Sequence, residues 1–257
     1  MRFVCNLFIC VICLYLCGGV ASVILKEVDV PPMVHINNED DDDLRVILDC
    51  HYEIEDNKSF LVVKWLKDGE IAYQWIRGQP PSVFPNFVGK IEKNFAISTD
   101  PDQQYRGIAL VNVTIDTSGV YRCLVQSKEG TYSKEKKLQI VDISNYTLNL
   151  FHNRIQNETH LECSIEHIYP QPMISLGSDD GDAISIISSQ VNEDQNGYYN
   201  ASTVAVVNDD DDDVDQYECV ITFGNLPLNL TKTTSSKGAS LNVFATLFII
   251  PIFLIFN

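Results

Sequence analysis

Two cysteines, Cys50 and Cys123, stand 73 residues apart, with Trp65 between them and Tyr121 two positions before the second cysteine. This order is typical of a β-sandwich in which the cysteines come from facing sheets and the indole packs on the disulfide between them. A tyrosine two positions before the second cysteine ties the preceding turn to its own strand through the hydroxyl group. The pattern therefore predicts two packed sheets joined by a Cys50–Cys123 disulfide.

These residues resemble the signature of an immunoglobulin domain, and part of it is repeated further along the chain. Cys163 and Cys219 stand 56 residues apart, and Tyr217 again precedes the later cysteine by two positions. The longer first spacing leaves room for an extra hairpin in the first domain only. We therefore expect an all-β protein of two tandem immunoglobulin-like β-sandwiches, variable-like and then constant-like. The second domain lacks the tryptophan, and Ile174 or Leu176 is expected in its place.

The two ends of the chain carry apolar runs of different kinds. Residues 1–22 combine one early cation, an apolar run and small residues at the end, which is typical of a cleaved secretory signal peptide. Their four cysteines would be removed, leaving four for two disulfides. Residues 233–257 begin with small residues and end in an apolar tail with no lysine or arginine after it, which is typical of a lipid-anchor attachment signal. Ser236 is the predicted attachment site, and a transmembrane helix is the alternative.

Removal of both ends leaves a first domain at 23–142 and a second domain at 143–232. In the first domain, alternation and β-branched residues predict strands at 44–50, 60–67, 70–76 and 107–115. The dipeptide Asp68-Gly69 predicts a tight turn between the second and third of these, because glycine readily takes the positive φ such a turn needs.

Several segments of the first domain resemble the beaten path family of insect cell-surface proteins. They are Cys50-His51-Tyr52-Glu53-Ile54-Glu55, Val63-Lys64-Trp65, Tyr73-Gln74-Trp75, Pro80-Pro81 with Phe84, and Asn112-Val113-Thr114-Ile115-Asp116-Thr117-Ser118-Gly119. The resemblance implies a two-domain neuronal recognition protein that binds a sidestep-type immunoglobulin partner and guides axons. The missing second tryptophan and the aspartate runs depart from the family pattern.

Partner-binding residues are expected on the broad sheet of the variable-like domain. Strict alternation along 70–76 places Ile71, Tyr73 and Trp75 on one face. Tyr73 and Trp75 are candidates because such side chains bury much area at little entropic cost. Phe84 and Phe87, in the following loop, are further candidates. The alternative is that Tyr73 and Trp75 pack inward.

The chain is acidic, with 35 Asp and Glu against 18 Lys and Arg and a net charge of −17, so nucleic acid is excluded as a partner. Two acidic runs, Glu39–Asp43 and Asp209–Asp213, contribute much of it. Carboxylates suit calcium, but neither run has the spacing of an EF-hand loop, and we expect solvated loops and no metal. Glycosylation sequons stand at Asn57, Asn112, Asn145, Asn157, Asn200 and Asn229, of which Asn112 is the one expected to be unused.

Motifs of an enzyme are absent: the sequence has no nucleophile elbow, phosphate loop or zinc-protease motif, and no cofactor is expected. The sequence predicts an extracellular, lipid-anchored adhesion or guidance receptor that acts through its first domain. Its partner would be another immunoglobulin-family surface protein, with pairing of two copies left open. The alternatives are an immune or pathogen-recognition protein and a soluble secreted form.

Overall fold

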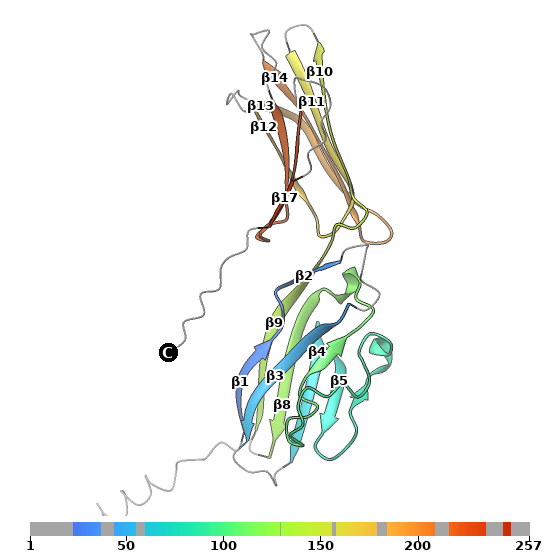
Figure 1. Ribbon diagram of the computed structural model, residues 1–257, viewed down its shortest axis with the longest axis vertical. Coiled ribbons are helices and arrows are strands. Elements are labelled where there is room, and N and C mark those ends of the chain that lie inside the picture. The colour runs from blue at the N-terminus through green and yellow to red at the C-terminus, as the bar shows by residue number, and fades with distance from the viewer. Residues whose placement is uncertain are drawn as a thin grey trace, which may run out of the picture. The chain divides into compact units, whose positions relative to one another are not determined.

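The structure is a computed structural model that describes residues 23–36, 44–54, 60–128, 130–155, 158–178, 184–208, 216–234 and 244–247. The chain forms two compact units that divide between Gln139 and Ile140, three residues before the expected boundary. Apart from two short 3-10 helices, the described regular structure is entirely β (Figure 1). The elements of the first unit are β1 (Val23–Asp29), β2 (Met33–Ile36), β3 (Val46–Ile54), β4 (Leu61–Lys67), β5 (Glu70–Ile76), β6 (Ser82–Val83), η2 (Pro85–Phe87), β7 (Ile108–Leu110), η3 (Ile115–Thr117), β8 (Gly119–Ser127) and β9 (Thr131–Asp142).

Two sheets make up the first unit. One has the strand order β1-β3-β7, and the other has the order β2-β9-β8-β4-β5-β6. The added β5 and β6 form the extra hairpin that the long cysteine spacing predicts, so the variable-like assignment is confirmed. The chain changes sheets between β1 and β2 at Pro31-Pro32, since proline has no N–H to donate to a ladder. The Pro32 carbonyl instead accepts the N–H of Gln139, 3.1 Å away.

The core of the first unit follows the sequence signature. Cys50 and Cys123 form the predicted disulfide, and Trp65 pairs with Cys123 across β4 and β8 and is fully buried. The Tyr121 hydroxyl donates to the carbonyl oxygen of Thr117 at 2.9 Å, which confirms the predicted tie between the turn and β8.

Most strand limits agree with the sequence, and one differs for a clear reason. Asp68 and Gly69 adopt φ values of 50° and 87°, which gives the predicted tight turn between β4 and β5. The strand expected at 107–115 is shortened to β7, Ile108–Leu110. Asn112 takes a φ of 51°, which is incompatible with extended backbone, and η3 follows it.

The second unit is also a sandwich of two antiparallel sheets. One has the order β10-β11-β14-β13, and the other has the order β12-β15-β16-β17. The order β10-β11-β14-β13 is that of the four-stranded sheet in a constant-type domain, so the constant-like assignment is confirmed as well. The elements are β10 (Thr147–Ile155), β11 (Glu158–Ile168), β12 (Met173–Ser178), β13 (Ile184–Glu193), β14 (Tyr199–Asn208), β15 (Tyr217–Thr222), β16 (Leu228–Thr233) and β17 (Phe244–Leu247).

Leu176 takes the place of the missing tryptophan. Cys163 and Cys219 form the second disulfide. Leu176 pairs with Cys219, just as Trp65 pairs with Cys123 in the first unit, and packs against the buried Leu161 and Tyr217. Of the two aliphatic residues expected for this position, the structure selects Leu176.

The C-terminal region is described only in part. Ser236 lies outside the described residues, so lipid attachment there stays a prediction. β17 pairs antiparallel with β16, with Leu247 opposite Leu228. Among the residues that the structure describes, no helix has the length and apolar character needed to cross a membrane.

Candidate protein-recognition surface

Tyr73 and Trp75, the aromatic residues expected to face a partner, are buried in the first unit, with 2% and 1% of their surfaces exposed. The Tyr73 hydroxyl donates to the carbonyl oxygen of Tyr105 at 3.0 Å. The Trp75 ring meets the Tyr105 ring edge-on, with centroids 5.9 Å apart. The outward placement of these two side chains is therefore wrong, and the inward alternative holds.

A register shift explains which residues of β5 face outward. Trp65 pairs with Tyr73, but the next residue, Leu66, pairs with Ile71, so Ala72 is the extra residue of a β-bulge. Because paired residues share a face, Tyr73 points inward with Trp65, while Ile71 points outward with Leu66. Strict alternation placed Ile71 together with Tyr73, and the bulge breaks that alternation.

Phe84 and Phe87, the other candidate anchors, lie around η2. Phe87 is 9% exposed, and Phe84 is half-buried. Phe87 lines a cavity of about 350 Å³ together with the buried Ile91 and Leu110. Phe87 therefore belongs to the core rather than to a docking surface.

The outward face of β4, β5, β8 and β9 is the surface that remains for a partner (Figure 1). We call it the recognition face. Its residues follow from the pairings Val62 with Ile76 and Gln126, Lys64 with Gln74 and Leu124, Leu66 with Ile71 and Arg122, and the continuation of these rows into β9. They are Val62, Lys64, Leu66, Ile71, Gln74, Ile76, Val120, Arg122, Leu124, Gln126, Thr131, Ser133, Glu135 and Lys137.

The centre of the recognition face is aliphatic. Ile76 and Val120 are each 37% exposed, and Leu66, Ile71 and Leu124 are half-buried. Val62 completes this apolar set but is itself almost covered. Aliphatic side chains gathered on one face of a sheet, with polar residues around them, are typical of a protein–protein contact. The sequence reasoning missed them because it searched for aromatic anchors.

Charged residues lie among and beside these aliphatic side chains. The Arg122 guanidinium binds the Glu135 carboxylate, with Nε and Nη2 at 2.7 and 2.5 Å from Oε2. Lys64 is half-buried beside Leu124, and the exposed Lys137 pairs with Val120 across β8 and β9. No ion pair of Lys64 or Lys137 occurs among the described residues.

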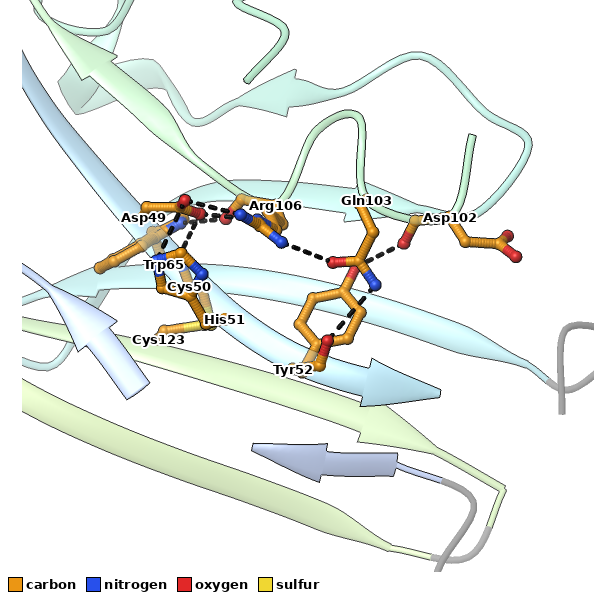
Figure 2. Close-up of a disulfide and its surroundings, with 9 residues drawn as sticks. All are labelled: Asp49, Cys50, His51, Tyr52, Trp65, Asp102, Gln103, Arg106 and Cys123. Atoms are coloured by element: carbon orange, nitrogen blue, oxygen red, sulfur yellow. Dashed lines mark hydrogen bonds and ion pairs between the residues drawn. A yellow bond between two sulfur atoms is a disulfide. The ribbon is translucent and has the colours of Figure 1, made fainter. Parts of the chain in front are cut away.

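The segment between η2 and β7 closes the side of the sandwich next to β3 and β5. Arg106 binds Asp49 of β3 through two parallel bonds, Nε to Oδ1 at 2.8 Å and Nη2 to Oδ2 at 2.9 Å (Figure 2). The Arg106 carbonyl accepts the indole N–H of Trp65 at 2.9 Å, and the Tyr52 hydroxyl donates to the carbonyl of Asp102 at 2.8 Å. These contacts join β3 of one sheet to β4, one of the strands that present the recognition face.

Burial also changes the pKa of two tyrosine hydroxyls in this region. Removal from water raises the pKa of Tyr52 and of Tyr73 above the ordinary value of 10, because the phenolate form loses its hydration. Both hydroxyls therefore stay protonated and act as hydrogen-bond donors at neutral pH.

The sequons lie outside the recognition face. None of β4, β5, β8 and β9 contains one. In the second unit, Asn200 is exposed on β14 and Asn229 is half-buried on β16, so sequons occur on both sheets of that unit. Asn112 uses its side-chain nitrogen to donate to the Gly89 carbonyl at 2.8 Å. Asn57 and Asn157 lie outside the described residues.

Metal ligands do not gather in the described part of the chain, where no group of three or more His, Cys, Asp or Glu side chains could hold an ion. The acidic runs Glu39–Asp43 and Asp209–Asp213 both lie outside the described residues. Calcium binding by these runs is therefore not tested.

Comparisons with known proteins give the fold. No protein-family model matches the chain, and no curated protein matches it. Among solved structures, it is similar to bovine butyrophilin, with 16% identity, 84% of this chain and 99% of that chain covered, and a TM-score of 0.59. It also aligns with a marsupial T cell receptor (16% identity, 83% and 61% covered, TM-score 0.43) and the extracellular portion of mouse CD200RLa (15% identity, 78% and 96% covered, TM-score 0.45). At 16% identity, the similarity to butyrophilin shows a shared fold alone.

Proposed function

We propose that this chain is a cell-surface recognition protein that binds another immunoglobulin-type surface protein through the recognition face. The observation that carries this proposal is the aliphatic centre of that face, with Leu66, Ile71 and Leu124 half-buried and Ile76 and Val120 more than a third exposed. Apolar side chains gathered on one face of a sheet in a strongly acidic protein are unfavourable in water unless a partner covers them.

The distribution of sequons supports the same face. A used sequon excludes protein contact around it, and the sequence places none on the strands of the recognition face. Asn200 and Asn229 stand on opposite sheets of the second unit. The strands that form this broad sheet in the first unit thus carry no sequon.

The resemblance to the beaten path family makes the proposal more specific. It supports a sidestep-type partner and a role in axon guidance. The small residues around Ser236 and the apolar tail support attachment to the outer face of the plasma membrane through a lipid anchor. On this proposal the chain binds and positions a partner and needs neither cofactor nor catalytic residue.

A binding screen tests the proposal. The purified full chain, coated on beads, is exposed to multimers of immunoglobulin-family ectodomains that include sidestep-type proteins, because multivalency reveals weak contacts. We expect binding that Leu124→Asp lowers by at least about tenfold, since a carboxylate in the apolar centre would be desolvated without a partner. The matched control is Val88→Asp, which changes a valine that is 70% exposed and lies off the face. Binding that survives Leu124→Asp, or that occurs only to microbial surfaces, contradicts the proposal.

A further inference from the structure

The recognition face differs in charge from the rest of the protein. The whole chain has a net charge of −17. The face carries three cations, Lys64, Arg122 and Lys137, and one anion, Glu135, so that 3 − 1 gives a net charge of +2. A cationic face on an acidic protein points to electrostatic selection of the partner, because complementary charge governs which surfaces associate.

Two of the three cations are available to a partner. Glu135 already neutralises Arg122 through the 2.5 and 2.7 Å contacts. Lys64 lies between Gln74 and Leu124 in the middle of the sheet, and Lys137 lies opposite Val120 at its margin. Both lysines adjoin the apolar centre, so a partner that covers the aliphatic residues also removes water from the lysine ammonium groups.

We propose that the recognition face selects a different protein, whose apolar docking surface carries carboxylates opposite Lys64 and Lys137, and that it rejects a second copy of this chain. The inference rests on the proposed function, since it names the chemistry of the partner at the same face. It predicts that two copies do not pair, a question that the sequence leaves open.

Symmetry is the reason why a second copy fits poorly. A twofold contact between two copies uses the same patch on both. It would therefore set a face of +2 against a face of +2 and desolvate four lysine ammonium groups without anions to pair them. Like charges opposed in this way disfavour association, whereas carboxylates on the partner would supply the missing pairs.

The experiment uses a variant of this chain as the partner of complementary charge. The double substitution Lys64→Glu with Lys137→Glu changes the charge of the face by −4, from +2 to −2, and leaves its aliphatic centre intact. Purified full-length protein, wild type and variant, is coated on beads of two colours. Flow cytometry counts one-colour and two-colour aggregates at low and high salt.

We expect few aggregates in either one-colour sample and about tenfold more in the mixture, where +2 meets −2. High salt should reduce the two-colour aggregates, since the charges are partly exposed. The control variant, Lys90→Glu with Lys93→Glu, has the same total charge but alters exposed lysines in the segment after η2, outside the face, and mixing it with wild type should have no effect. Adding Leu124→Asp to the wild-type partner should abolish the mixed aggregates.

Two results overturn the inference. One is aggregation of wild-type beads alone to the level of the mixture, which would show that the face accepts a second copy. The other is a mixture that aggregates no more than its components. Neither result depends on the ectodomain screen, so failure of the charge selection is distinguishable from failure of the proposed function.

Discussion

The indole N–H of Trp65 donates to the backbone carbonyl of Arg106, 2.9 Å away and 41 residues later in the chain. The same arginine holds Asp49 through its side chain, so one residue joins the core tryptophan to β3 (Figure 2). The segment before β7 is thus part of the core rather than an independent loop.

Trp65→Phe tests the hydrogen bond between the indole N–H and the Arg106 carbonyl. Phenylalanine fills most of the indole volume but leaves the Arg106 carbonyl without its donor. We expect a loss of about 1–3 kcal/mol in the free energy of unfolding, from the unpaired carbonyl and the reduced packing. Urea unfolding followed by circular dichroism measures it. A variant as stable as wild type would show that this bond contributes nothing.

Arg106→Met tests the ion pair. The Arg106 and Asp49 side chains are only 20% and 12% exposed, so loss of the guanidinium leaves a nearly buried carboxylate without its two arginine bonds. The Asp49 carboxylate keeps the Cys50 N–H, at 2.7 Å, and His51 Nε2, at 3.3 Å. We expect a loss of about 3 kcal/mol in the free energy of unfolding. The matched control is Arg122→Met, whose ion pair with Glu135 is 48% exposed on both sides and should contribute less than about 1 kcal/mol. Equal losses in the two variants would contradict this account.

Gly119→Ala tests the contact between β8 and the turn that follows β4. A Cβ at Gly119 would lie 2.5 Å from Asp68 Oδ2, so the Asp68 side chain would have to move away from the Val120 N–H that it accepts at 2.8 Å. We expect a loss of about 1 kcal/mol in the free energy of unfolding. In the background of Asp68→Ala the same glycine substitution should cost less, because the bond is already absent and only the strain of alanine at a φ of 157° remains. A double-mutant cycle that is strictly additive would exclude the coupling.

The stability of the first unit should depend on acid through Asp68. Burial acts to raise its pKa, but hydrogen bonds from Lys67 and the Val120 N–H outweigh burial and hold the pKa below the ordinary value of 3.8. A lowered folded-state pKa means that the contribution is complete above the ordinary pKa and is lost as pH falls through the lowered value. Unfolding of wild type and Asp68→Asn from pH 7 to pH 2 should give curves that converge only in strong acid. A constant difference over this range would contradict the prediction.

Both disulfides should be necessary for export. They close loops of 73 and 56 residues, and each contributes roughly 4 kcal/mol by chain entropy, a large part of the stability of a domain this size. Replacing both cysteines of either bridge by alanine should sharply lower the amount of protein outside the cell, measured by immunoblot of surface and medium. Normal export of either variant would show that its unit is stable without the bridge.

Most of what could be predicted about the fold came from residues that are close together in the sequence. Asp68-Gly69 specifies its turn by backbone preference, and the strand at 70–76 agrees with β5 to the residue. The cysteines and Trp65 specify the two sheets that they join. The residue that replaces the second tryptophan could be narrowed only to Ile174 or Leu176, because the two have the same parity along the strand. The pairing of Leu176 with Cys219 separates them.

The recognition face could not be predicted in the same way. The bulge at Ala72 turns Ile71 to the outer face, away from the side that Tyr73 and Trp75 share. It arises from the pairing of β4 with β5 rather than from the residues of β5 alone. The partnership of Asp49 with Arg106 joins positions 57 residues apart, and no local pattern marks it.

The sequence by itself determined the all-β class, the two disulfides, the variable-like and constant-like order and the acidic charge, because each depends on spacing, composition or neighbouring residues. Only the tertiary structure decided that Tyr73 and Trp75 lie inside, that aliphatic residues face outward, and that Lys64 and Lys137 stand among them. The orientation of a strand's side chains depends on its register with the neighbouring strand, and that register forms only when both strands pack on a common core.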